Sequence, residues 1–202
     1  MRAVTRLFVA IELPEEVKDL LEPLCRGVPG ARWMRDRQFH LTLRFLGELE
    51  GPAARAVADA LHAVRSAPFE LEVAGVGHFP PRGDPRVLWA GLRPSDELLE
   101  VHRQVQKVVR RTGLPPEERK FAPHISLARL HAAPLPRVLE FLREHAALRS
   151  EPFVVDGLQL FRSVLGHDGA QHVLEASYPL FPGRPGPAPC PGADLPPGQP
   201  LS

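Results

Sequence analysis

Cysteine is scarce in this sequence, with only Cys25 and Cys190 among 202 residues. The first lies in a predicted helix and the second in a proline-rich stretch, so a disulfide framework is not indicated and a reducing compartment fits better. Long hydrophobic runs are missing too: no apolar stretch is long enough to span a membrane, and residues 1–10 show no signal-peptide pattern. We therefore expect a cytoplasmic protein with no membrane partner.

An excess of charge of one sign is also lacking. The 25 Lys and Arg residues and 24 Asp and Glu residues leave a formal net charge of +1. Proteins that bind long nucleic acids over a broad surface carry a stronger basic excess, so we expect any contact with RNA to be local, at an end or a single nucleotide. The length allows one sizeable hydrophobic core, or two small lobes that share one.

Motifs of two common enzyme classes are absent. The sequence has no His-Glu-x-x-His string and no cysteine cluster, which argues against a metallohydrolase. It has no recognisable nucleotide-binding loop, which argues against an ATP-driven reaction. We therefore predict an activity without a metal or another cofactor.

Two short strings repeat the same chemistry, His-Leu-Thr-Leu at residues 40–43 and His-Ile-Ser-Leu at residues 124–127. Side chains alternate between the two faces of a strand, so each histidine shares a face with the hydroxyl two residues later. One such histidine alone is more simply a structural residue, but the repetition argues for a function. Two such faces across a cleft supply two bases and two donors, which suits proton transfer at a bound phosphate ester.

The order of predicted elements repeats as well. Strand, helix and two strands follow His40, and the same order follows His124, which lies 84 residues later. This periodicity indicates an internal duplication. We predict an α+β fold with two similar lobes, each an antiparallel sheet covered by helices, related by a pseudo-twofold axis with a central groove. The predicted strands cover 7–13, 39–46, 69–79, 87–92, 121–130, 153–165 and 170–180, and the predicted helices cover 14–24, 53–64, 95–111 and 135–148.

The composition changes at residue 182. Residues 182–202 are rich in proline and glycine and have little apolar surface to bury. Such a segment cannot offset the entropy lost on ordering, so we expect a flexible tail after a single bilobal domain at 1–181.

Four segments resemble one family. They are Arg-Leu-Phe-Val-Ala-Ile at 6–11, His-Leu-Thr-Leu-Arg-Phe-Leu-Gly at 40–47, Gly-His-Phe at 77–79 and Phe-Ala-Pro-His-Ile-Ser-Leu-Ala-Arg at 121–129. The chain is similar, over nearly all of residues 5–181, to the two-histidine (2H) phosphoesterase superfamily. Within it, the chain resembles the RNA 2′,3′-cyclic phosphodiesterases, also called 2′-5′ RNA ligases.

This resemblance implies a bilobal α+β fold and a metal-independent hydrolase. Its substrates would be RNA ends or nucleotides that carry a 2′,3′-cyclic phosphate, opened to a 2′-phosphomonoester. An RNA 5′-hydroxyl in place of water would give reversible 2′-5′ ligation without ATP. The second string has serine where many members have threonine, which keeps the donor. The roles implied are His40 and His124 as the catalytic pair, Thr42 and Ser126 as phosphate contacts, and Phe8 and Arg129 as nucleotide contacts.

For two arginines, the alternation of side chains along a strand and the family resemblance lead to different expectations. Strict alternation puts Arg44 on the face of His40 but puts Arg129 on the face opposite His124. Arg129 reaches the same face only if the strand ends, twists or bulges after Leu127.

The other histidines lack a paired hydroxyl. We expect surface roles for six of them and a structural role for the seventh, His78, beside a proline-rich turn. The six are His62, His102, His131, His145, His167 and His172.

Several alternatives stay open at this stage. The chain could act on small cyclic nucleotides, could bind phosphorylated RNA ends without turnover, or could use a histidine or Ser126 as a covalent nucleophile. The sequence does not say which of His40 and His124 is the acid and which the base. We expect a monomer.

Overall fold

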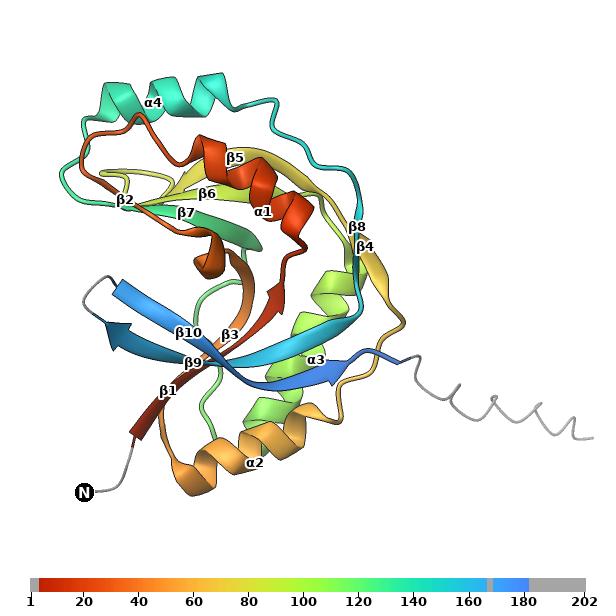
Figure 1. Cartoon of the computed structure of the whole chain (residues 1–202). Helices are drawn as coiled ribbons and strands as arrows, with labels where there is room; N and C mark the ends of the chain where they lie inside the picture. Colours follow the sequence, from red (N-terminus) through yellow and green to blue (C-terminus); the bar gives the residue numbers. More distant parts are fainter. Residues whose placement is uncertain (1–3, 167–168, 182–202) are drawn as a thin grey trace, which may run out of the picture.

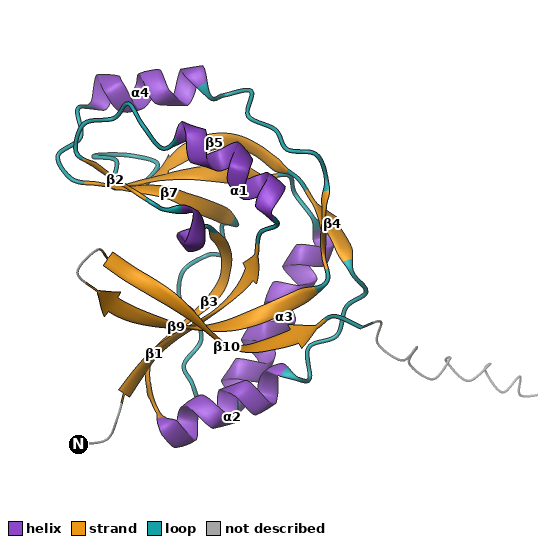
Figure 2. Ribbon diagram, in the orientation of Figure 1, coloured by secondary structure: helices purple, strands orange, loops and turns teal. Residues whose placement is uncertain are grey.

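The computed structural model describes residues 4–166 and 169–181, and its α+β fold confirms the predicted class (Figure 1, Figure 2). The predicted tail at 182–202 and the centre of the last hairpin turn, residues 167–168, lie outside the described residues. The strands are β1 (Val4–Glu12), β2 (Ala31–Trp33), β3 (His40–Glu50), β4 (Phe69–Leu71), β5 (Val73–Phe79), β6 (Val87–Leu92), β7 (His124–Leu130), β8 (Phe153–Val155), β9 (Gly157–Gly166) and β10 (Gly169–Pro179). The helices are α1 (Glu15–Leu21), α2 (Gly51–Leu61), α3 (Asp96–Arg111) and α4 (Leu135–Glu144), with 3₁₀ helices η1 (Glu22–Leu24) and η2 (Asp36–Gln38).

The main sheet has eight antiparallel strands in the order β10-β9-β1-β3-β7-β6-β5, with β2 beside β7. Its two halves, β10-β9-β1-β3 and β7-β6-β5, are joined by the pairing of β3 with β7. A single residue pair, Leu41 with Ile125, makes that joint. A second sheet contains only β4 and β8. The two predicted lobes are therefore two halves of one sheet.

Helices cover the halves in an exchanged arrangement (Figure 1). The lower half in that view carries α2 and α3, and the upper half carries α1 and α4. Helix α3 follows β6 of the upper half yet packs on β3 and α2 of the lower half. The segment after α1 makes the reverse crossing, since the Cys25 thiol donates to the Leu127 carbonyl of β7 at 3.9 Å. Each half thus depends on a helix that the other half supplies.

Helix α3 illustrates how local sequence sets an element. Ser95 caps its N-terminus, where the hydroxyl accepts a hydrogen bond from the Leu98 backbone N–H at 3.1 Å. Val101, Val105 and Val108 recur at helical spacing and are buried against the sheet. The helix ends before Gly113, whose φ of 91° is readily adopted only by glycine.

The observed strands differ from the predicted ones mainly where a predicted strand is interrupted. The predicted strands 69–79 and 153–165 are each divided, because the chain passes from the small sheet to the large one between β4 and β5 and between β8 and β9. The three-residue strand β2 was not predicted, since it has no periodic pattern of its own. In the described ranges, no helix combines the length and the apolar character needed to cross a membrane.

Candidate active site

The two histidine strings meet where the halves of the sheet join. His40 begins β3 and His124 begins β7, and each precedes a residue of the Leu41–Ile125 pair. Leu41 and Ile125 are both fully buried, so they face the core. Side chains alternate along a strand, and both histidines therefore lie on the opposite face of the sheet, beside the joint.

The joint also reveals the symmetry of the site. Leu41 and Ile125 are 84 residues apart, the same offset that separates His40 from His124. Equivalent residues of the two repeats are thus paired with each other, which is the arrangement that a local twofold axis produces.

Thr42 and Ser126 share the histidine face. Each lies two residues after its histidine and is half-buried, while the leucine that follows each is buried in the core. Neither hydroxyl has a hydrogen-bond partner in the part of the chain that the structure describes. Both hydroxyls are therefore available to donate to a bound anion.

The backbone orients both imidazole rings in the same way. His40 Nδ1 lies 2.8 Å from the carbonyl oxygen of Gln38, and His124 Nδ1 lies 2.7 Å from the carbonyl oxygen of Ala122. A carbonyl can only accept, so Nδ1 carries the proton in each neutral ring. The Nε2 atom is then left to accept a proton or, in the charged ring, to donate one.

Aromatic side chains form a wall behind each histidine. His40 lies against Phe8 and Phe161, with ring centroids 4.8 and 6.5 Å away. His124 lies against Phe79 and Trp89, with ring centroids 4.9 and 6.4 Å away. These apolar walls desolvate both rings.

Desolvation sets the charge state of the pair. Burial, the charge of His172 and the charge of His124 lower the pKa of His40 to about 4, against an opposing effect of the Gln38 carbonyl. Burial lowers the pKa of His124 as well, and the Ala122 carbonyl partly offsets this. Both rings are therefore neutral at pH 7 in the free protein. An anion placed between them would raise both pKa values.

His172 belongs to this site, and its expected surface role is wrong. It lies on β10 opposite Ser163 and is half-buried. Its ring centroid is 4.8 Å from that of His40 and 4.9 Å from that of Phe8. The sequence did contain a signal, because Gly166 and Gly169 mark the ends of two strand-like runs. Their pairing sets the register that puts His172 opposite Ser163.

Arg44 does not lie on the histidine face, so that expectation is wrong. A bulge changes the register: Ala10 pairs with Thr42 but Val9 pairs with Arg44, which leaves Leu43 without a partner on β1. Arg44 consequently turns to the core side and is only 4% exposed. It donates hydrogen bonds there to the Gln106 side chain and to the Pro115 carbonyl oxygen.

The same bulge recurs in β7 and determines the position of Arg129. Trp89 pairs with Ser126 but Leu88 pairs with Ala128, which leaves Leu127 without a partner on β6. Arg129, one residue after Ala128, is exposed on the face of His124, which strict alternation alone does not predict. Its equivalent in the first repeat, Phe45, is 62% exposed.

The remaining histidines lie outside the site. His131 is exposed, and His167 lies outside the described residues. His78 is half-buried on β5, and its Nδ1 has no hydrogen-bond partner among the described residues. The surface role expected for His102 and for His145 is wrong, because both side chains are half-buried. Three rings pack on aromatic neighbours: His62 on Tyr178, His102 on Phe121 and His145 on Phe141, with centroids 4.9, 3.8 and 4.6 Å apart.

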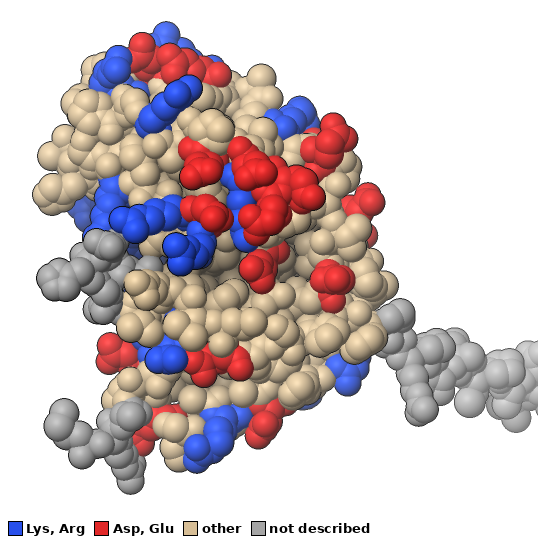
Figure 3. Space-filling view, in the orientation of Figure 1, with Lys and Arg blue, Asp and Glu red and all other residues tan. Residues whose placement is uncertain are grey.

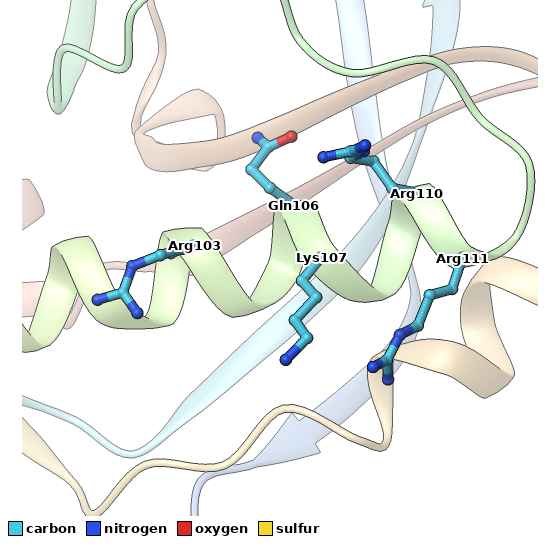
Figure 4. A pocket seen from close by; sticks show the side chains of 5 residues that line it. All are labelled: Arg103, Gln106, Lys107, Arg110 and Arg111. Carbon is cyan, nitrogen blue, oxygen red and sulfur yellow. The ribbon is translucent and has the colours of Figure 1, made fainter.

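A separate cavity of about 420 Å³ lies on α3 (Figure 4). Its lining residues all come from that helix and are mostly cationic, namely Arg103, Gln106, Lys107, Arg110 and Arg111. None of the site histidines lines it. Among the described residues, no group of three or more His, Cys, Asp and Glu side chains is placed to hold a metal ion.

Two repeats, each with a histidine and a hydroxyl that face one site, define a two-histidine phosphoesterase. Residues 11–89 and 92–170 each match the family described as LigT like phosphoesterase. The chain belongs to this family, and each matched range contains one of the two histidine strings.

Known relatives agree with this assignment. An RNA 2′,3′-cyclic phosphodiesterase of Thermus thermophilus is 35% identical over 193 residues, which cover 87% of this chain and 90% of the relative. One of Aeropyrum pernix is 34% identical over 145 residues, which cover 71% of this chain and 82% of the relative. The crystal structure of the Thermus thermophilus protein TT0787 has a TM-score of 0.74 at 30% identity and covers 89% of this chain and 100% of that chain.

Proposed function

We propose that this chain opens a terminal 2′,3′-cyclic phosphate on RNA to a 2′-phosphomonoester by two-histidine acid-base catalysis. The observation that carries the proposal is the joint at Leu41 and Ile125, which brings His40 and His124 to one face with both Nδ1 atoms held by carbonyls. The names of the relatives support the same activity.

Each ring has one task in this reaction. One neutral imidazole takes a proton from water through Nε2 as the water attacks phosphorus. The other imidazole, in its charged form, gives a proton to O3′ as the P–O3′ bond breaks. The leaving oxygen lies opposite the attacking one, so the ring beside O3′ is the acid and the ring beside the water is the base.

The two hydroxyls hold the phosphate between the rings. Thr42 and Ser126 would each donate a hydrogen bond to a non-bridging oxygen, where negative charge is held in the transition state. Their lack of other partners among the described residues supports this role. The anion that they bind also raises the pKa of the neighbouring histidines, so binding itself prepares one ring to carry the proton.

The two nucleotide contacts implied by resemblance differ in their surroundings. Arg129 is exposed on the histidine face and stays in the proposal as a nucleotide contact. Phe8 lies against the His40 and Phe161 rings and is only 3% exposed, which leaves little of its ring for a base. Its contacts support a packing role for Phe8 behind His40.

The activity can be tested directly on the full chain. An RNA oligomer that ends in a 2′,3′-cyclic phosphate should be converted to a 2′-phosphate end with EDTA present, while His40→Ala and His124→Ala each lower the rate by about 10²–10⁴-fold. Full activity in either variant, or loss of the wild-type activity with EDTA, would overturn the proposal. Binding without turnover would favour a binding module, and a trapped phosphoenzyme would favour covalent catalysis.

Ligation is the same chemistry with another nucleophile. An RNA 5′-hydroxyl in place of water would attack the cyclic phosphate and form a 2′-5′ linkage, with the proton released to the base and O3′ protonated by the acid. No ATP is consumed. Both reactions should be lost together in His124→Ala, and ligation that survives this change would separate the two activities.

We also infer that the protein works as a monomer in the cytoplasm. A single chain supplies both histidines and both hydroxyls, so the site needs no second copy. Cys25 is a free thiol, and burial raises its pKa to about 11, which disfavours its reactive thiolate. Light scattering behind a sizing column would test the monomer.

A further inference from the structure

Two arginines face each other across neighbouring strands beside the site. Arg32 of β2 pairs with Arg129 of β7, and directly paired residues of antiparallel strands point to the same face. The next pair, Trp33 with Ala128, faces the core, where Trp33 packs on Phe141 of α4. Arg32 and Arg129 therefore both lie on the opposite face, which is the face of His124.

Nothing in the described residues neutralises this pair. Both arginines are exposed, and neither has an ion pair or a side-chain hydrogen bond with another described residue. Like charges directly opposite each other on a sheet destabilise it. A bound anion would turn this repulsion into attraction to both groups, and guanidinium groups match the geometry of phosphate.

The arginine pair lies one step along the sheet from the proposed phosphate site. On β6, Trp89 is opposite Ser126 and Val87 is opposite Arg129. These two positions are two residues apart, which is about 6.6 Å at roughly 3.3 Å per residue. An arginine side chain can bridge part of that distance, so the pair is placed to reach a second phosphate next to the one held by the histidines.

We propose that Arg32 and Arg129 together bind the phosphate that joins the last two nucleotides of an RNA chain, so that a cyclised RNA end is preferred over a cyclic mononucleotide. This inference rests on the proposed function, and it names the substrate class for the same site. A cyclic mononucleotide has no such phosphate and gains nothing from Arg32.

The charge distribution of the surface agrees with this path for the RNA. Figure 3 shows Lys and Arg side chains gathered over the β2 side of the upper half, whereas Asp and Glu gather over α1. The other cationic face, on α3, offers a matched control. Arg110 lies in the α3 cavity, and Arg32 is absent from the residues that line it (Figure 4).

The test compares two substrates in each variant. We measure kcat/KM for a cyclic mononucleotide and for a short RNA with the same terminal nucleotide, using the wild type, Arg32→Gln, Arg32→Lys and Arg110→Gln. Loss of a charged hydrogen bond should lower the ratio of RNA to mononucleotide about tenfold in Arg32→Gln. Arg32→Lys should recover part of the ratio, and Arg110→Gln should leave both values unchanged.

The salt dependence gives a second readout that does not need turnover. Binding of the RNA product, with its 2′-phosphate end, should weaken with salt less steeply in Arg32→Gln, by about 0.7 in the slope of log affinity against log salt. If Arg32→Gln changes neither the ratio of RNA to mononucleotide kcat/KM nor the salt slope, the proposed role of the arginine pair is overturned while the proposed function stands. Wild-type protein that hydrolyses neither substrate would instead overturn the proposed function.

Discussion

The imidazole of His172 meets that of His40 edge-on, with ring centroids 4.8 Å apart and ring planes inclined by 82°. His124 also lies against two aromatic side chains, but no other imidazole lies against it among the described residues. The two halves of the site are therefore electrostatically unequal, although their backbones repeat one pattern. When it is protonated, His172 carries a charge that lowers the pKa of His40 and has no counterpart beside His124.

We predict that His172→Gln raises the pKa of His40 from about 4, because the substitution removes a repulsive charge while keeping a polar side chain. NMR titration of the ring protons would measure the shift. The pKa of His124 should stay unchanged, and His62→Gln, on an exposed ring that packs on Tyr178, serves as the control. A His40 titration that does not move would show that the charge of His172 does not contribute to the pKa of His40.

The depressed pKa of His40 also predicts how stability depends on pH. The unfolded chain binds a proton at His40 below its ordinary pKa of about 6.5, whereas the folded protein does so only near 4. The stabilising contribution is therefore complete above 6.5 and is lost as the pH falls toward 4, by up to about 3 kcal/mol. Urea unfolding at several pH values should show this loss in the wild type and a smaller one in His40→Gln.

Much of this site could be predicted from the sequence, because it rests on local patterns. The alternation around residues 40–43 and 124–127 predicted the strands, and their repetition predicted the duplication that the family match at 11–89 and 92–170 confirms. The class of fold followed from the order of strands and helices. These features depend on the short-range spacing of apolar and polar residues, which a single sequence displays.

The sequence could not predict features that depend on how strands pair. The bulges at Leu43 and Leu127 reverse the faces of Arg44 and Arg129, and each depends on a neighbouring strand from elsewhere in the chain. The exchange of helices between the two halves of the sheet likewise depends on tertiary contacts. Strand β2 is too short to show periodicity, so the pairing of its Arg32 became visible only in the structure.

The hydroxyls should affect the chemical step more than binding. We predict that Ser126→Ala lowers kcat by about 10²-fold with a smaller change in KM, because the lost donor acts mainly on transition-state charge. Ser126→Thr should keep most of the activity, since it keeps the hydroxyl. Steady-state kinetics on the cyclised RNA would separate kcat from KM. An alanine variant as active as the wild type would remove Ser126 from the proposed mechanism.

A chain of contacts should couple Arg44 to the second histidine. Arg44 donates a hydrogen bond to Gln106, and the Gln106 amide lies 3.0 Å from His102 Nε2. The His102 ring stacks on Phe121. Phe121 immediately precedes Ala122, whose carbonyl oxygen contacts the His124 ring. Truncating the arginine, which is itself buried, removes the hydrogen bonds that it donates to the Gln106 side chain and to the Pro115 carbonyl oxygen.

We therefore expect Arg44→Ala to lower the free energy of unfolding by about 2–4 kcal/mol, and urea titration would measure it. Arg110→Ala, on the exposed face of the same helix that carries Gln106, should change stability by less than about 0.5 kcal/mol. An Arg44 variant as stable as this control would show that the contacts from Gln106 and Pro115 are dispensable.

Gly77 limits what can lie behind His124. A Cβ added at this glycine would come within 2.2 Å of the Trp89 ring, and Trp89 is one of the two aromatic side chains behind His124. We predict that Gly77→Ala displaces the indole, costs about 1–3 kcal/mol of stability and lowers activity through His124. Gly51→Ala is the matched control, because its Cβ would meet only the end of the Arg55 side chain at 3.6 Å. Thermal unfolding and kcat measured on both variants would decide the point: equal values for the two would mean that Trp89 can move without disturbing the histidine.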